Sequence, residues 1–170
     1  MQIITTHRNT DFDGFASLVA AKLIYPDAVA AVPRAVNANV RAFMSIHKEV
    51  FDYMERQDVA IDRVSRLIVV DTADWNRLGP LAQLRRRPDL EVCMWDHHVG
   101  GDIDASWKCQ EAVGATITLL VRELKALRKP ITPVQATLFL AGLYEDTGNL
   151  TFSSSTAEDA YAAGWLLDHK

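Results

Sequence analysis

The chain has 170 residues, enough for one domain, and its 18 Lys and Arg against 22 Asp and Glu give a formal net charge of −4. Hydrophobic residues at 49% and charged residues at 24% are typical of a globular protein and argue against disorder. No apolar run is long enough to cross a bilayer and no signal peptide precedes the domain, so we expect a cytoplasmic protein without membrane contact. Two cysteines are too few for a disulfide framework and are predicted to be free thiols.

Short β-rich runs alternate with helical patterns along the first half of the chain, and the second half is helical. Runs typical of buried strands occur at residues 2–6, 28–32, 66–70 and 90–95. Apolar spacing and capping residues predict helices over 15–25, 40–56, 78–87, 115–128, 133–144 and 156–168. This alternation predicts an α/β fold, a mostly parallel sheet flanked by helices.

Acidic and imidazole side chains follow three of the predicted strands at the point where each strand ends. Because ligands bind beyond the carboxyl ends of parallel strands, we expect these side chains to share one edge of the sheet. A fourth contribution could come from Asp146, just after a predicted helix. The set comprises His7, Asp11 and Asp13 after the first strand, Asp71 after 66–70, and Asp96, His97 and His98 after 90–95.

Each of these acidic positions also has an ordinary structural interpretation. Asp13 could cap the helix that follows it, and Asp71 could begin a turn. The segment Asp146-Thr147-Gly148 could be a helix exit with Gly148 in a left-handed conformation. The adjacent histidines after Asp96 have no such simple structural reason.

Five carboxylates and three imidazoles in one cleft would repel or take up protons unless a cation neutralised them. Mixed carboxylate and imidazole ligands without thiolate suit Mn²⁺, Mg²⁺, Fe²⁺ or Zn²⁺. The ligands are too many for one open catalytic ion and suit two ions bridged by a shared carboxylate, as in phosphoryl hydrolysis. Because bound cations would neutralise these carboxylates, the net negative charge of the chain does not exclude a phosphate-bearing or nucleic-acid substrate.

Four motifs in this order resemble those of the DHH phosphoesterases. They are His7-x-Asn9-x-Asp11-x-Asp13, the strand-final Asp71, the triplet Asp96-His97-His98, and Asp146-Thr147-Gly148, covering residues 7–148. The resemblance implies a sheet of about five strands and a hydrolase that uses a pair of metal ions, Mn²⁺ or else Mg²⁺, to activate water against a phosphate ester.

The resemblance also implies a role for each matching residue. His7, Asp11 and Asp71 would hold one ion, and Asp13, Asp71, His97 and Asp146 the other, with Asp71 bridging. Asp71, Asp96 and His98 would form the catalytic group, Asp96 by orienting a histidine. His98 would face the substrate phosphate, together with Asn9 of the first motif. Independently of the resemblance, Arg8 lies near a strand end and could contact phosphate or be an ordinary surface charge.

Residues 6–17, 114–120 and 144–148 are similar to one branch of this family, in which a DHH domain precedes CBS domains and a tRNA nucleotidyltransferase/poly(A) polymerase-like domain. We therefore expect residues 1–170 to be a single domain of a longer multidomain protein, with those domains as partners and a nucleotide or short oligonucleotide as substrate. Exposed apolar surface where other domains dock could also drive homodimerisation.

Two other functions stay open at this point. Nothing after Asp146 resembles the second, substrate-binding domain of complete DHH enzymes, so the chain could be a nucleotide- or RNA-binding regulatory module with little turnover. A pyrophosphatase or exopolyphosphatase would use the same metal chemistry on a different phosphate bond.

Overall fold

A six-stranded parallel sheet forms the centre of the computed structural model, which describes every residue from Met1 to Lys170. The strand order is β3-β2-β1-β4-β5-β6, and each neighbouring pair is parallel. The prediction of an α/β fold with a parallel sheet is therefore confirmed. The strands are β1 (Gln2–Thr5), β2 (Val29–Val32), β3 (Met54–Glu55), β4 (Arg66–Val70), β5 (Glu91–Asp96) and β6 (Trp107–Gln110).

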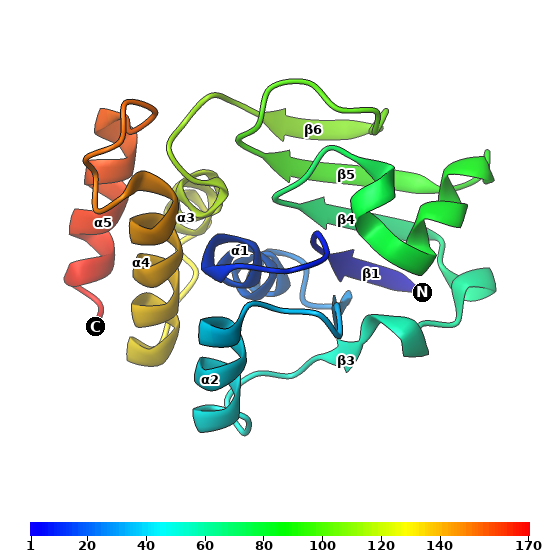
Figure 1. Ribbon diagram of the computed structural model, residues 1–170, viewed down its shortest axis with the longest axis horizontal. Coiled ribbons are helices and arrows are strands. Elements are labelled where there is room, and N and C mark those ends of the chain that lie inside the picture. The colour runs from blue at the N-terminus through cyan, green and yellow to red at the C-terminus, as the bar shows by residue number, and fades with distance from the viewer.

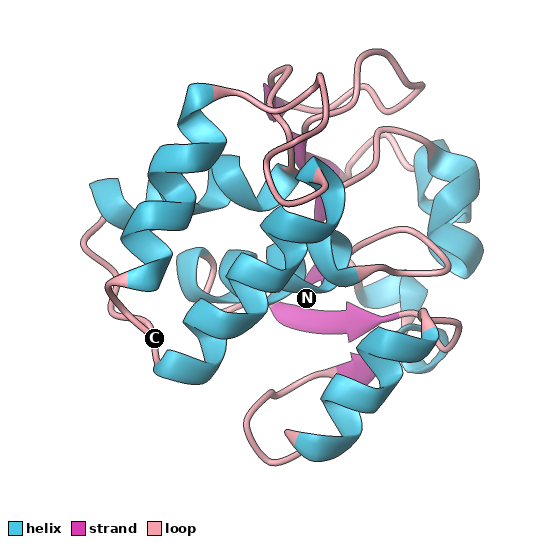
Figure 2. Cartoon of the chain, turned by 60° about the vertical axis from the view of Figure 1, so that its left-hand side comes forward, coloured by secondary structure: helices cyan, strands magenta, loops and turns pink.

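The arrows of β1, β4, β5 and β6 point toward the side of the molecule where α1, α3 and α4 lie (Figure 1). In the turned view several helices lie in front of the strands, and other helical segments flank them (Figure 2). None of the helices has the length and apolar character needed to cross a membrane. The helices are α1 (Phe12–Ile24), α2 (Ala38–Ile46), α3 (Thr116–Ala126), α4 (Pro133–Thr147) and α5 (Ala157–Leu167), with 3-10 turns η1 (Arg56–Asp58), η2 (Ile61–Arg63) and η3 (Trp75–Arg86).

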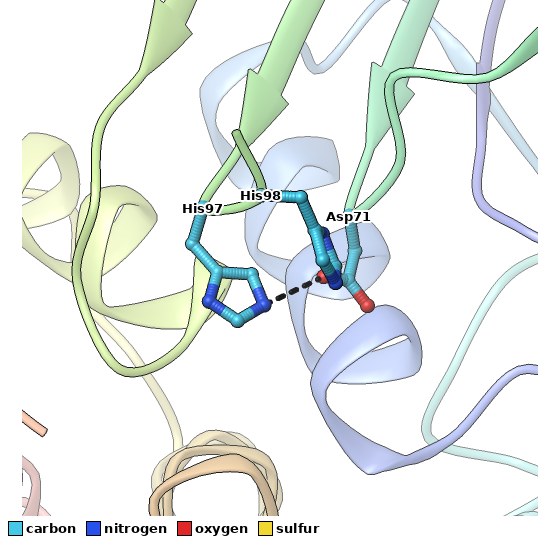
Figure 3. Close-up of side chains that lie close together, drawn as sticks. All are labelled: Asp71, His97 and His98. Carbon is cyan, nitrogen blue, oxygen red and sulfur yellow. Dashed lines mark ion pairs between the residues drawn. The ribbon is translucent and has the colours of Figure 1, made fainter. Parts of the chain in front are cut away.

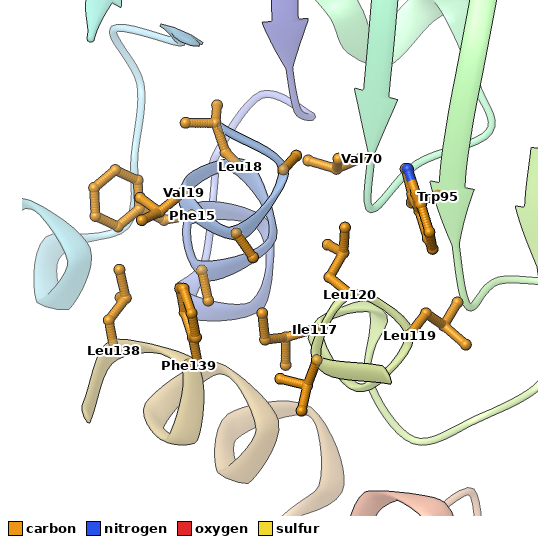
Figure 4. Packing of buried hydrophobic residues seen from close by; sticks show 14 of the residues in the cluster. Phe15, Leu18, Val19, Val70, Trp95, Ile117, Leu119, Leu120, Leu138 and Phe139 are labelled. Carbon is orange, nitrogen blue, oxygen red and sulfur yellow. The ribbon is translucent and has the colours of Figure 1, made fainter. Parts of the chain in front are cut away.

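The two faces of the sheet bury two separate apolar clusters, because successive strand residues point to opposite faces. In β4, Ile68 and Val70 join the larger cluster, whereas Leu67 and Val69 join the smaller one. The larger cluster is built with α1, α3 and α4, whose buried side chains meet below the sheet in Figure 4. The turns of η3 cover the smaller cluster. Strands covered on both faces explain the continuous apolar runs in the sequence.

Several element boundaries differ from the predictions. The helix expected over 40–56 ends at Ile46, and Phe51, whose spacing suggested a helix, instead packs its ring edge-on against Phe15 at 5.6 Å. The segment 78–87 forms 3-10 turns instead of a regular helix, because Gly79 has a φ of +58° and Pro80 follows it. The edge strands β3 and β6 were not predicted, since one has two residues and the other reads Trp-Lys-Cys-Gln, largely polar and partly exposed.

Helices α1 and α4 approach each other closely at Gly142. A Cβ at this position would lie 2.8 Å from the Phe12 carbonyl oxygen and 3.0 Å from both the Ala16 Cβ and the Asp13 Cα. The absence of a side chain therefore allows the last turn of α4, which carries Asp146, to lie beside the first turn of α1.

Replacing Gly142 with alanine is expected to lower the free energy of unfolding by about 1–3 kcal/mol, because the added methyl group overpacks the contact between α1 and α4. Urea denaturation measures this change. The matched control is Gly164→Ala in α5, where a Cβ would meet nothing within 4 Å. The control should be neutral or gain up to about 1 kcal/mol from helix propensity, and equal effects at the two glycines would contradict the prediction.

Candidate metal centre

The carboxyl ends of three adjacent strands and the ends of two helices converge on one cluster of ligand atoms. Strand β1 leads to His7, β4 leads to Asp71, and β5 leads to the histidine pair. The first turn of α1 and its cap supply Asp13 and Asp11. Asp146 lies in the last turn of α4, not after the helix as the sequence suggested, since α4 runs on to Thr147.

One group of ligand atoms consists of His7, Asp11 and Asp71. His7 Nε2 lies 3.1 Å from Asp71 Oδ2 and 3.5 Å from Asp11 Oδ1. His7 Nδ1 donates to the Arg8 carbonyl oxygen at 2.9 Å, and this bond leaves the lone pair of neutral Nε2 directed into the group. Asp11 also caps α1, accepting from the Gly14 amide at 3.0 Å. The helix cap that the sequence assigned to Asp13 is therefore Asp11, one position before the helix begins.

A second group consists of Asp13, Asp71, His97 and Asp146. His97 Nε2 lies 3.2 Å from Asp146 Oδ2 and 3.7 Å from Asp71 Oδ1, the contact drawn as a dashed line in Figure 3. His97 Nδ1 donates to the Val113 carbonyl at 3.1 Å, so neutral Nε2 again faces the carboxylates. In both groups a backbone carbonyl sets the orientation of the histidine ring.

Asp71 belongs to both groups and is almost fully buried. Its Oδ2 faces His7, while its Oδ1 faces His97 and accepts a hydrogen bond of 2.7 Å from the Thr116 hydroxyl. The backbone of Asp71 has a φ of +61°, a conformation that non-glycine residues seldom adopt. The fold thus holds the strand-final aspartate in an unfavourable backbone conformation so that one oxygen points to each group.

Two observations bear on whether this cluster suits divalent cations. His97 Nε2 is buried and makes no hydrogen bond of good geometry, although it is aimed at two carboxylates. Beside His7 Nε2, Gly14 leaves room that a side chain would fill, since a Cβ there would lie 2.9 Å from that nitrogen. Carboxylate and imidazole donors with no thiolate suit Mn²⁺, Mg²⁺, Fe²⁺ or Zn²⁺, so the residues present fit divalent cations.

The ionisation of the cluster reflects its excess of buried acid. Burial lowers the pKa of His7, but the carboxylates of Asp11 and Asp71 outweigh it and raise that pKa to about 10. Burial also lowers the pKa of His97, but the nearby carboxylates of Asp146 and Asp71 outweigh it and raise that pKa to about 9. Burial raises the pKa of Asp13 well above its ordinary value, and the charges of neighbouring aspartates add to the rise. Protons therefore supply the positive charge that a cation would supply.

The N-terminus of α3 donates hydrogen bonds to two carboxylates of the cluster, Asp13 and Asp71. The sequence did not predict these contacts. The backbone amides of Thr116 and Ile117 donate to the two oxygens of Asp13 at 2.7 and 2.8 Å. The Thr116 hydroxyl, besides binding Asp71, accepts from the His97 amide at 3.3 Å. The threonine stands in a segment that resembled the family branch, but no spacing rule pointed to its contacts.

A buried carboxylate on α5 fixes the loop that leads into α3. Asp159 Oδ2 accepts from the amides of Gly114 and Thr156 at 2.9 and 2.6 Å, and its Oδ1 accepts from the Thr118 hydroxyl at 2.6 Å. Asp159 has no exposed surface. It therefore joins α5, α3 and the loop before Thr116, and through that loop it supports the candidate ligands Asp13 and Asp71.

The structure places Asp96 and His98 differently from the candidate ligands of these two groups. Asp96 is fully buried at the end of β5, and its Oδ1 accepts from His98 Nδ1 at 2.7 Å. His98 is half exposed, and its ring lies 4.2 Å from that of His97 and within reach of Asp71 (Figure 3). Arg8 and Asn9 follow His7 directly but are exposed and belong to none of the ligand groups.

The fold and this cluster agree with the comparison to known families. Residues 2–143 match the DHH family, N-terminal domain, and the chain belongs to that family. The resemblance seen in the motifs is thereby confirmed. Asp146 lies just beyond the matched residues.

Two relatives are tRNA nucleotidyltransferases. The chain is 40% identical over 171 residues to an A-adding tRNA nucleotidyltransferase of Geobacter sulfurreducens, matching 99% of this chain and 19% of that protein. It is 29% identical to an A-adding tRNA nucleotidyltransferase of Aquifex aeolicus, again over 19% of the relative. The chain thus spans about a fifth of the length of these relatives.

Solved structures share the fold at lower sequence identity. An exopolyphosphatase-related protein from Bacteroides fragilis superposes with a TM-score of 0.79 at 18% identity, over 98% of this chain and 52% of the other. A Methanococcus jannaschii protein described as a putative family II inorganic pyrophosphatase gives 0.77 at 22% identity, over 99% of this chain and 55% of the other.

Metal binding is expected to release protons. With pKa values raised to about 10 and 9, His7 and His97 are protonated at neutral pH in the metal-free chain, whereas a cation needs their neutral Nε2 atoms. The apparent affinity for Mn²⁺ should therefore rise with pH until these values are passed. Calorimetric titration in two buffers of different ionisation enthalpy measures the released protons, and a binding enthalpy independent of the buffer would contradict the prediction.

Replacing Asp159 with asparagine is expected to lower the free energy of unfolding by about 2–3 kcal/mol, because a buried amide cannot accept all the hydrogen bonds that the carboxylate accepts. Thermal or urea denaturation measures the loss. The neighbouring Glu158→Gln variant is the matched control, since Glu158 only joins an exposed ion pair with Arg122 worth about 0–1 kcal/mol. Similar losses in both variants would count against a special role for Asp159.

Proposed function

We propose that this chain is a divalent-metal-dependent phosphoesterase domain that hydrolyses phosphodiester or related phosphate bonds of nucleotides or oligonucleotides. The observation that supports this most is Asp71, whose two oxygens each face a different group of ligand atoms. A carboxylate shared by two cation sites would hold the two ions close together, as two-metal phosphoryl transfer needs.

In this proposal His7, Asp11 and Asp71 hold one ion, and Asp13, Asp71, His97 and Asp146 hold the other. Mn²⁺ is the ion we expect, with Mg²⁺ as the alternative, because the motifs match a family for which the resemblance implies a pair of such ions, and carboxylate and imidazole donors are compatible with them. When bound, the ions supply Lewis acidity toward a phosphoryl oxygen and lower the pKa of water.

The chain's own residues would bind and orient the substrate around these ligands. His98 is half exposed beside the cluster, and Asp96 fixes its ring by accepting from Nδ1. Nε2 stays free, and in the imidazolium form it would donate to a substrate phosphate. Asp96 is thus a positioning residue. Arg8 and Asn9 are exposed next to His7 and would contact further phosphate oxygens.

A second candidate is a binding module that holds nucleotide or RNA phosphate with little turnover. The relatives named as A-adding tRNA nucleotidyltransferases favour it, because this chain matches only a fifth of each of them. In either case we propose that residues 1–170 act as one domain of a longer chain, beside CBS and nucleotidyltransferase domains.

A screen that measures both inorganic phosphate and cleaved nucleotide products separates these functions. The chain is loaded with Mn²⁺ and offered a short oligonucleotide, inorganic pyrophosphate and polyphosphate. Release of nucleoside monophosphates from the oligonucleotide is expected. Release of inorganic phosphate from pyrophosphate or polyphosphate, without cleavage of the oligonucleotide, would overturn the proposal in favour of a pyrophosphatase or exopolyphosphatase. Metal-dependent binding without any turnover would favour the binding module.

Two substitutions test the ligand assignment itself. His97→Ala and Asp71→Asn should each lower Mn²⁺ affinity and Mn²⁺-dependent hydrolysis by roughly 10²-fold or more, since even residues behind the metal ligands account for about 10–100-fold. Calorimetry and the hydrolysis assay measure the two effects. His169→Ala, which removes an exposed histidine near the C-terminus, is the matched control and should behave as wild type. Unchanged metal affinity in His97→Ala would refute the assignment.

A further inference from the structure

A basic pocket lies between α2 and the carboxyl ends of β2 and β3, apart from the metal ligands. Its volume is about 430 Å³, within the range of about 300–1,000 Å³ typical of small-ligand sites. Val36, Met44 and Tyr53 contribute apolar and aromatic surface, and Arg34, Arg41 and Lys48 contribute positive charge.

The charge of this pocket is opposite to that of the chain. The chain carries a net charge of −4, whereas the lining of the pocket holds three cations and a single carboxylate, Glu55. Glu55 lies 3.8 Å from Arg34 in an exposed ion pair. Arg41 takes part in no ion pair, and Lys48 only in an exposed contact of 4.0 Å with its neighbour Glu49. Two cations are therefore available to an anionic ligand.

The pocket is joined to the metal centre through the backbone. The loop after β2 pairs with the motif loop after β1, since Thr10 and Val36 form a parallel bridge. The Asn9 amide donates to the Ala35 carbonyl at 2.9 Å, and the Asn37 amide donates to the Thr10 carbonyl at 2.8 Å. Val36 thus lines the pocket while it pairs with Thr10, the residue directly before the candidate ligand Asp11.

We propose that this pocket binds one nucleotide unit of a single-stranded oligonucleotide whose neighbouring phosphate lies at the metal centre. Arg41 and Lys48 bind the backbone phosphate, and the base lies against Tyr53 and Met44. A basic groove combined with an aromatic surface is the usual way in which proteins hold single strands without reading their sequence. The inference rests on the proposed function, because it names the substrate class of that site and a surface that selects it over pyrophosphate.

The test measures binding of a short fluorescein-labelled single-stranded RNA by fluorescence anisotropy in EDTA, so that neither metal nor hydrolysis contributes. The double variant Arg41→Ala/Lys48→Ala should weaken binding several-fold. It should also reduce the slope of log K against log salt concentration by about 0.7 for each phosphate that the two cations neutralise in the wild type. The matched control is Arg86→Ala/Lys125→Ala, which removes two exposed cations outside the pocket and should leave both quantities close to wild type.

Competition identifies which part of the ligand the pocket recognises. Adenosine monophosphate should displace the RNA at concentrations where inorganic phosphate does not, because only the nucleotide reaches Tyr53 and Met44. Equal displacement by the two would overturn the assignment of a nucleotide. Equal losses in the pocket and control variants, or no RNA binding by the wild type at low salt, would overturn the pocket as the binding site.

Mn²⁺ titration of the same variants separates this inference from the proposed function. The pocket variant should bind Mn²⁺ as the wild type does, because neither substituted residue belongs to a ligand group. RNA binding that depends on the pocket in a chain that binds no Mn²⁺ would leave this inference standing and overturn the proposed function. Loss of Mn²⁺ binding in the pocket variant would instead show disruption of the fold and would overturn the interpretation of the RNA result.

Discussion

The constraint on which the rest of this structure depends is the burial of negative charge at one edge of the sheet. Asp13 and Asp71 are buried, and Asp146 lies close by. Because like charges repel strongly in a medium of low dielectric, each of these carboxylates increases the free energy needed to ionise the others. The chain offsets this cost in two ways: histidines face the carboxylates, and backbone amides at the N-terminus of α3 donate to both oxygens of Asp13. The helix N-terminus also carries partial positive charge, which favours an anion there.

The same contacts hold the helices together, so the cluster and the fold are not independent. Asp13 on α1 binds the amides of α3, and Asp159 on α5 binds the loop that leads into α3. Gly142 lets α4 approach α1 closely enough for Asp146 to reach His97. A cation that replaces protons in this cluster would therefore strengthen contacts among three helices and three strands. Metal binding and folding stability are for this reason coupled in such a centre.

The sequence predicted the sheet and the region of the site because both follow from local rules. Continuous apolar runs mark strands buried on two faces, and polar residues directly after them must lie at the carboxyl edge. The remaining features depend on tertiary contacts. Phe51 continued a helical spacing but packs from a loop onto Phe15, and Thr116 reaches Asp71 across 45 positions of the chain. No local pattern encodes such contacts, and the residue roles inferred from the family resemblance stay predictions.

The net charge of −4 conceals two regions of opposite sign at the same edge of the sheet. A site that hydrolysed an isolated small anion such as pyrophosphate would need only the acidic region and its cations. A polymer carries further phosphates and bases beyond the reacting bond, and these need positive charge and apolar surface at a distance from the metal ligands. The pocket of Arg34, Arg41 and Lys48 has that composition, and its loop pairs with the loop that carries Asp11. The proposal of an oligonucleotide substrate over pyrophosphate therefore rests on the distribution of charge more than on the candidate metal ligands.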